Sequence, residues 1–208
     1  MYEVEIKVPA DVDAVRERLR DAGAERVDTR HQSDVYYDAP HRNFAETDEA
    51  LRVRHETALP GGLDSGASGE ADETGEAGEA DEIGGETTKL TYKGPLLDSA
   101  SKTRTEHETE VADGDAVAGA FTGLGFEPAA TVEKHREFWS YDGFTVTLDA
   151  VDGLGEFVEI ERAVDDEAAI DAVRDEAMAA LDRLGLDAAD QVRTSYLGLL
   201  LDGSVDGE

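Results

Sequence analysis

The chain opens on MYEVEIKV (residues 1–8), in which charged and apolar side chains alternate. Successive side chains of an extended strand point to opposite faces of its sheet. One face of this stretch is therefore charged and carries Glu3, Glu5 and Lys7, and the other face is apolar. The alternation predicts a β-strand with one face suited to a core and one face suited to water or to a polar ligand.

Seven further segments show the same alternation, which is typical of half-buried strands. They cover residues 34–38, 50–56, 88–93, 103–111, 131–141, 144–150 and 156–163. Four segments combine helical spacing of apolar residues with helix end signals, namely residues 11–24, 113–124, 166–184 and 188–201. Eight strands, mostly consecutive, with helices between some of them, predict an α+β domain built on a large antiparallel sheet or a closed barrel.

Basic residues concentrate on the polar faces of these predicted strands, although the chain as a whole is acidic. Asp and Glu number 50 against 19 Lys and Arg, which gives a formal net charge of −31. A sheet with one solvated face would be the simpler explanation of a single polar face, but a solvated face of this chain should itself be acidic. Eight basic residues lie on the strand faces: Lys7, Arg52, Arg54, Lys89, Lys93, Arg104, Lys134 and Arg136.

We therefore expect the charged faces to point into a closed eight-stranded antiparallel β-barrel, with helices covering the apolar outer faces. Side chains can line the interior of an eight-stranded barrel. An interior that carries both cations and carboxylates suits a polyphosphate bound with Mg²⁺ or Mn²⁺, because oxygen ligands suit these ions. Burying so many charges without a ligand is costly, so the pattern predicts a hydrated tunnel and a polyanionic substrate.

The composition excludes several other classes of protein. The acidic balance argues against a nucleic-acid polymer as partner, since such binders carry a basic face, and we interpret it as adaptation of the surface to high salt. The absence of cysteine excludes disulfides and thiolate metal sites. No apolar run of about 18 residues and no signal peptide is present, so we expect no membrane contact and, by elimination, a cytoplasmic location.

The length of 208 residues suits one domain, expected over residues 1–201. Residues 58–87 are rich in Gly, Ala, Glu and Asp and poor in large apolar side chains. Such a segment buries too little surface to offset its ordering entropy. We predict a disordered acidic loop at 58–87 that joins two strands, and a disordered tail at 202–208.

The strand motifs resemble, in type and in order, those of the CYTH family, also called triphosphate tunnel metalloenzymes. The family's ExExK motif matches Glu3-Val4-Glu5-Ile6-Lys7, which alone would be weak evidence. The later motifs follow in order: DVYYD (34–38), LRVR (51–54), TYKGP (91–95), RTEHE (104–108), KHR (134–136) and LDAVDGLGEFVEIE (148–161). Within the family, class IV adenylate cyclases are most similar, through DVYYD followed by Pro40, the KGP segment and GLGEFVEIE.

The resemblance implies a set of metal ligands and a set of phosphate-binding residues. One or two Mg²⁺ or Mn²⁺ ions would be held by Glu3, Glu5, Asp149, Glu159 and Glu161. The triphosphate would be held by Lys7, Arg52, Arg54, Lys93, Arg104, Lys134 and Arg136, and Glu106 could extend either set. The family also suggests a homodimer.

The implied reaction is attack of the ribose 3′-oxygen of ATP on its own α-phosphate, which yields cyclic AMP and pyrophosphate. No general base is identified. His55, His107 and His135 alternate away from the charged strand faces, so we interpret them as packing or surface residues.

Two other functions remain open. A triphosphatase that hydrolyses inorganic, thiamine or nucleoside triphosphate would use the same residues, with water as the nucleophile. A non-catalytic module that binds a polyphosphate or nucleotide is the third hypothesis. An adenine-reading pocket at one mouth of the tunnel would separate these functions, and the sequence does not locate one.

Overall fold

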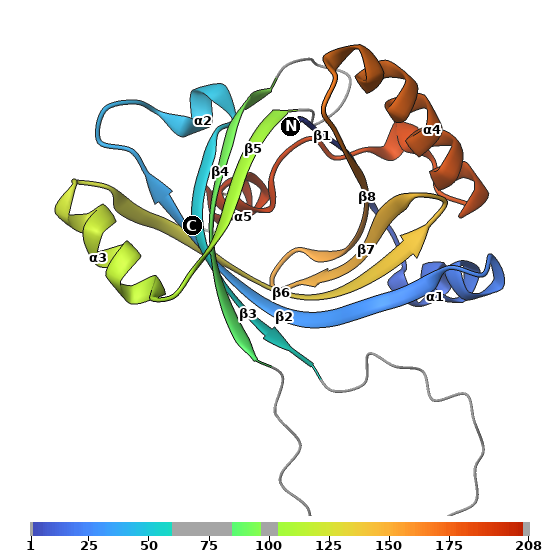
Figure 1. Cartoon of the computed structure of the whole chain (residues 1–208), viewed down its shortest axis with the longest axis horizontal. Helices are drawn as coiled ribbons and strands as arrows, with labels where there is room; N and C mark the ends of the chain where they lie inside the picture. The colour runs from blue at the N-terminus through green and yellow to red at the C-terminus, as the bar shows by residue number, and fades with distance from the viewer. Residues whose placement is uncertain (1, 60–84, 97–103, 206–208) are drawn as a thin grey trace, which may run out of the picture.

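Eight strands form a closed antiparallel barrel in the computed structural model, which describes residues 2–59, 85–96 and 104–205 (Figure 1). Their order around the barrel is β1-β5-β4-β3-β2-β6-β7-β8, and β8 pairs back onto β1. The predicted closed eight-stranded barrel is thus confirmed. The strands are β1 Tyr2–Pro9, β2 Glu25–Asp38, β3 Ala50–Ala58, β4 Glu86–Leu96, β5 Arg104–Val111, β6 Glu127–Tyr141, β7 Phe144–Val151 and β8 Gly155–Val164.

The barrel consists of two halves with the same order of elements. β1, the helix α1 (Val12–Asp21) and the β2-β3-β4 meander make up the first half. β5, the helix α3 (Gly114–Gly123) and the β6-β7-β8 meander make up the second. The halves interlock, because β1 pairs with β5 and β8 of the second half and β5 also pairs with β4 of the first. On the other side of the barrel they join through a long β2–β6 pair, whose register runs from Glu25↔Ser140 to Asp38↔Glu127.

The main hydrophobic core lies outside the barrel, between the outer faces of β1, β7 and β8 and the helices α1 and α4 (Ile170–Arg183) (Figure 1). Val4, Ile6 and Val8 of β1 are buried in this core. Burying an aliphatic side chain fully contributes about 1.5–3 kcal/mol, so the apolar half of the alternation fixes which face of β1 points outward. The charged half of the strand is thereby directed into the barrel.

The strand β2 is much longer than the predicted segment 34–38. Residues 25–33 carry few apolar side chains, because this part of β2 sends Arg30 into the barrel interior and its other residues are mostly half-buried or exposed and do not pack into the core. The period-two signal therefore appeared only from Asp34 onward, where Tyr37 is buried on the outer side of the strand.

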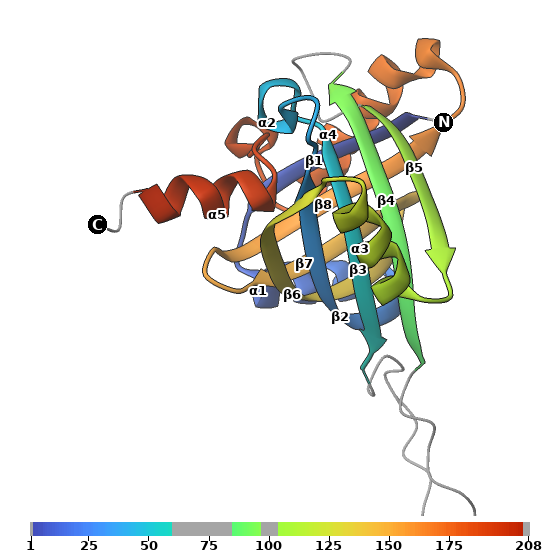
Figure 2. The ribbon, with the colours of Figure 1, turned by 90° about the vertical axis from the view of Figure 1, so that its left-hand side faces the viewer.

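The predicted helix at 188–201 is divided in the structure. A short 3₁₀ turn, Ala188–Asp190, is followed by non-helical residues 191–195 and by the helix α5, Tyr196–Val205. The backbone N–H of Val192 donates to the carbonyl of Lys7, so this connection is held against the end of β1 and cannot continue a helix. Figure 2 shows α5 leaving the barrel on one side.

Other boundaries differ by less. The helix α4 is preceded by a 3₁₀ turn at Glu167–Ala169, and a single helical turn, α2 (Phe44–Thr47), was not predicted. The expected tail at 202–208 begins too early, because α5 continues to Val205. The expected acidic loop is bounded by Ala58 and Glu86, and its residues 60–84 lie outside the described part of the chain, as do residues 97–103 and 206–208.

Within the described residues, no helix combines the length and the apolar character needed to cross a membrane.

We expect the melting temperature of the protein to rise with salt concentration. A formal net charge of −31 makes the folded chain repel itself, and raising KCl from about 0.1 M to about 1 M shortens the screening length from about 10 Å to about 3 Å. Differential scanning calorimetry across this range should show an increase of several degrees. A melting temperature that stays constant or falls would contradict the interpretation of the acidic surface as a salt adaptation.

Candidate active site

The barrel encloses a cavity of about 510 Å³ whose wall is densely charged. Its basic lining residues are Lys7, Arg30, Arg52, Arg54, Lys89, Lys93, Arg104, Lys134, Arg136 and Arg162. Its acidic lining residues are Glu3, Glu5, Asp48, Glu49, Glu56, Glu106, Glu108, Glu159 and Glu161. All seven residues predicted to hold a triphosphate are among them, whereas of the five predicted metal ligands Asp149 is not.

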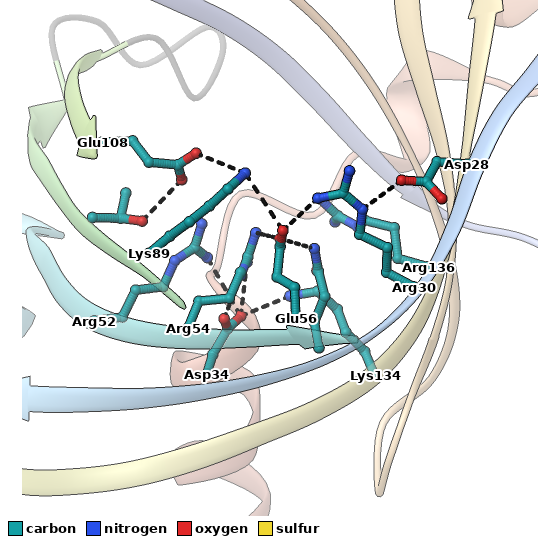
Figure 3. Close-up of polar contacts among 12 residues, drawn as sticks. Asp28, Arg30, Asp34, Arg52, Arg54, Glu56, Lys89, Glu108, Lys134 and Arg136 are labelled. Carbon is teal, nitrogen blue, oxygen red and sulfur yellow. Dashed lines mark hydrogen bonds and ion pairs between the residues drawn. The ribbon is translucent and has the colours of Figure 1, made fainter. Parts of the chain in front are cut away.

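Asp34 on β2 holds three of the predicted phosphate-binding cations together (Figure 3). Its carboxylate has no exposed surface; it accepts hydrogen bonds from Arg54 Nη2 at 2.8 Å and from Lys134 Nζ at 2.8 Å, and Arg52 Nη1 lies 3.5 Å away. Burial alone would raise the pKa of Asp34, but the charges of Arg54, Lys134 and Arg52 hold it well below its usual range. Asp34 is thus a fixed anion that keeps three cations side by side.

The cations around Asp34 outnumber the single carboxylate that binds them. Lys134 is almost fully buried, and burial, together with the positive charges of Arg54, Arg136 and Arg52, lowers its pKa to about 7 against the opposing effect of Asp34. A nearby anion stabilises the charged form of such a buried cation. The cluster is therefore suited to a ligand that brings several negative charges.

Three of the predicted metal ligands converge on one point of the cavity. One carboxylate oxygen from each of Glu3, Glu5 and Glu161 lies within 4.8 Å of the others. Burial raises the pKa of Glu3 well above its usual value, and burial together with Glu159 and Glu5 raises the pKa of Glu161 to about 7. An all-oxygen donor set whose charges repel one another fits a hard divalent cation, which would offset that repulsion.

The other two predicted metal ligands bind Arg136 instead. Asp149 and Glu159 both accept hydrogen bonds from this guanidinium, one of them at 2.6 Å from Arg136 Nε to Asp149 Oδ1. Asp149 also accepts a hydrogen bond of 2.8 Å from the hydroxyl of Tyr196. The structure thus divides the five predicted carboxylates into a group of three and a pair that fixes Arg136.

Lys93 connects the three converging carboxylates of Glu3, Glu5 and Glu161 with β5. Its Nζ lies 2.7 Å from Glu106 and 3.7 Å from Glu3. Although burial opposes the shift, Lys93 and Arg52 lower the pKa of Glu106 to about 2. Lys93 therefore links the predicted metal ligand Glu3 on β1 to Glu106 on β5.

The C-terminal connection lies across one end of the barrel. Lys7 Nζ donates to the carbonyl of Thr194 at 2.7 Å and lies 4.0 Å from the ring centroid of Tyr196. Ser195 and Tyr196 form part of the cavity wall. Arg104 is held at the connection between α2 and β3, where it pairs with Asp48 at 2.6 Å.

Several charged residues in or beside the cavity had no role assigned from the sequence, although Lys89 was placed on a charged strand face. Arg30 pairs with Glu56 and with Asp28, and Lys89 lies 3.5 Å from Glu56 and 3.2 Å from Glu108 (Figure 3). Asp34 itself stands in the DVYYD motif but was not assigned a role. Asp34 alternates with Gln32 and therefore shares a strand face with it. This signal could be used only once β2 was known to extend back to Glu25.

The interpretation of the histidines is confirmed. His55, His107 and His135 are exposed, and no histidine lines the cavity formed by the described residues.

A CYTH domain model matches residues 1–196. A Methanocaldococcus jannaschii protein, named only provisionally as an adenylate cyclase, is 34% identical over 200 residues, which cover 96% of this chain and 98% of the relative. The adenylate cyclase CyaB of Aeromonas hydrophila is 26% identical over 197 residues, which cover 94% of this chain and 86% of the relative.

Solved structures show the same fold. A Pyrococcus horikoshii protein superposes with a TM-score of 0.79 at 35% identity, covering 97% of this chain and 99% of that one. A Hippeastrum protein, named provisionally as an adenylyl cyclase and described with a dominant triphosphatase activity, superposes with a TM-score of 0.60 at 15% identity, covering 97% of this chain and 95% of that one. At that identity the likeness is one of fold.

Proposed function

The chain belongs to the CYTH domain family, and from this premise we propose that it is a Mg²⁺- or Mn²⁺-dependent enzyme that converts ATP to cyclic AMP and pyrophosphate. The observation that carries the proposal is the pairing of two groups in one cavity, namely the cations gathered on Asp34 and the converging carboxylates of Glu3, Glu5 and Glu161. Two relatives are named as adenylate cyclases, one of them provisionally, and these names support ATP as the substrate in this proposal.

The cations would bind and orient the triphosphate. Arg52, Arg54 and Lys134 are gathered on Asp34, and Arg136 is held by Asp149 and Glu159. Guanidinium groups present a planar fork of donors that matches phosphate oxygens. Held in place before the substrate arrives, they would neutralise the charge that moves onto the leaving pyrophosphate.

Glu3, Glu5 and Glu161 would hold the divalent cation. Asp149 and Glu159 offer the same oxygen donors on β7 and β8 and are proposed for a second ion, for which they would exchange hydrogen bonds from Arg136 for bonds to the metal. When bound, such ions would activate the 3′-hydroxyl and stabilise the leaving group. Lys93, which pairs with Glu3 and Glu106, would fix the carboxylate group relative to the phosphates.

Triphosphate hydrolysis is the second candidate reaction. The Hippeastrum protein, which shares the fold and is named provisionally as an adenylyl cyclase, is described with a dominant triphosphatase activity. The fold by itself therefore does not choose between the two reactions. Water in place of the ribose hydroxyl would use the same cations and carboxylates.

A product assay in high salt tests the proposal. The protein is incubated with ATP and separately with inorganic triphosphate, each with Mg²⁺ or Mn²⁺, and the products are separated by chromatography. Cyclic AMP with pyrophosphate supports the cyclase. Orthophosphate without a cyclic product identifies a triphosphatase, and no turnover of either substrate would leave a binding module.

We also expect inorganic triphosphate to bind more weakly as the pH rises above about 7, because the folded-state pKa of Lys134 is about 7 and only its protonated form pairs with phosphate. Each pH unit above that value lowers the protonated fraction of Lys134 by up to about tenfold. Calorimetric titration of tripolyphosphate at constant ionic strength measures the slope. Lys134→Met should bind more weakly and show a shallower slope, which separates the lysine from the titration of the phosphate itself; equal slopes in both proteins would contradict the expectation.

A further inference from the structure

The cavity changes character near the end of β6, where an aromatic ring joins the charged wall. Phe138 follows Lys134 and Arg136 on the inward face of this strand and lines the cavity. The rings of Tyr2, Tyr36 and Tyr196 also line the wall. Tyr2 packs against the hydrophobic core, the hydroxyls of Tyr36 and Tyr196 contact Arg52 and Asp149, and the Tyr196 ring packs on Phe157. The side chain of Phe138 has no polar group that could bind a phosphate or a metal ion.

A second, smaller hollow of about 270 Å³ adjoins the cavity at this point. It shares Arg30, Phe138 and Thr145 with the main cavity and is otherwise lined by Val27, Asp28, Trp139, Ser140 and Phe144. The β2–β6 register shifts between Arg26 and Asp28, which leaves Val27 unpaired in the ladder and 62% exposed. Such bulges often re-aim side chains beside a functional site.

The groups around the ring can bind a planar, hydrogen-bonding ligand. The guanidinium carbons of Arg30 and Arg136 lie 5.4 Å and 5.9 Å from the centroid of Phe138, and Asp28 pairs with Arg30 at 2.6 Å (Figure 3). Nucleobases are bound by stacking on aromatic rings and on guanidinium planes, with hydrogen bonds to their edges. Each Asp28 oxygen accepts one hydrogen bond here and has capacity for another.

The spacing along β6 orders these groups in a line. Phe138, Arg136 and Lys134 are each two residues apart, so successive side chains on this face are about 7 Å apart. The sequence of an aromatic ring, a guanidinium and a buried ammonium that joins the Asp34 cluster matches the order of base and phosphates in a nucleoside triphosphate.

We propose that Phe138, with Arg30 and Asp28, forms a nucleobase subsite at this end of the cavity, so that the substrate is a nucleoside triphosphate and not inorganic triphosphate. The inference rests on the proposed function, because it takes the neighbouring cations as the phosphate site. Its contribution is selectivity between two ligands that share the same phosphate contacts.

Calorimetric binding of ATP and of tripolyphosphate to the full chain in metal-free buffer tests the subsite. Phe138→Ala should weaken ATP binding by about tenfold or more, the loss expected when a stacking ring is removed, and should leave tripolyphosphate binding nearly unchanged. Phe138→Tyr keeps the ring and should retain ATP affinity. His135→Ala, an exposed position on the same strand, is the matched control and should change neither affinity, and circular dichroism melting checks that each variant is folded.

Three results would overturn the inference, and they can be told apart. An equal loss for both ligands in Phe138→Ala would mean that the ring shapes the tunnel. No loss for either ligand would place the base elsewhere while leaving the triphosphate site intact. Binding of neither ligand by the unaltered protein, without metal or with Mg²⁺, would overturn the proposed function itself.

Discussion

The double variant Glu3→Gln/Glu161→Gln is expected to lose turnover by more than about 10³-fold, because removing charged metal ligands removes both substrate positioning and charge stabilisation. The same variant should not be less stable than the unaltered protein. In the metal-free protein, burial raises the pKa of both carboxyl groups, that of Glu161 to about 7, so their charged forms oppose folding. The two effects together would identify carboxylates kept for function at the expense of stability.

The sign of the stability effect follows from proton linkage. Below the ordinary glutamate pKa of about 4.5, Glu161 is protonated in both the folded and the unfolded chain and contributes nothing. As the pH rises toward 7, the unfolded chain releases its proton first, and the folded state loses stability relative to it. The variant's advantage in melting temperature should therefore appear between about pH 4.5 and pH 7 and persist above that range.

Thermal melting in chelator and a product assay with Mn²⁺ measure the two effects. Glu25→Gln/Glu127→Gln, which removes two exposed carboxylates from β2 and β6, is the matched control and should retain activity. Wild-type turnover in Glu3→Gln/Glu161→Gln would show that the converging carboxylates are not the metal site.

Replacing Asp34 by Asn should destabilise the fold by about 3–5 kcal/mol, the usual cost of removing one partner from a buried ion cluster. Arg52, Arg54 and Lys134 would be left without their shared carboxylate in the interior of the barrel. A loss of this size is a large fraction of the stability of a typical domain. Urea unfolding at neutral pH measures it.

Tripolyphosphate should restore part of this stability, because it brings negative charge to the same cations. The partly exposed Asp28, which pairs with Arg30, provides the comparison through Asp28→Asn. A loss below about 1 kcal/mol for Asp34→Asn, as for a surface ion pair, would show that the cation cluster does not depend on Asp34.

The barrel and most of its charged wall could be predicted from alternation alone. In β1, the core takes Val4, Ile6 and Val8, and this fixes the inward direction of Glu5 and Lys7. The same reasoning placed Arg52 and Arg54 on the inward face of β3 and Lys134 and Arg136 on that of β6. Where the outer face of a strand packs on a core, its apolar residues identify that face, and the residues that alternate with them must point into the barrel.

The role of Asp34 could not be predicted in the same way. The first half of β2 has little apolar surface to mark its faces, and its Arg30 and Gln32 contact Glu56 on the neighbouring strand β3. Which carboxylates would converge also depends on side-chain partners. Glu159 and Glu161 share a strand face, yet Glu159 binds Arg136 and Glu161 approaches Glu3 and Glu5. Pairing of this kind is set by three-dimensional packing across strands, which a single sequence does not record.

The connection at residues 191–196, which is held to β1 by Lys7 and Val192, contributes Ser195 and Tyr196 to the cavity wall at the end away from Phe138. A nucleotide bound as proposed would enter with its terminal phosphate foremost and its base last. After cleavage, the cyclic nucleotide would lie in front of the pyrophosphate and would depart first. The enzyme would then follow an ordered release in which pyrophosphate, as the last product to leave, competes directly with the next molecule of ATP.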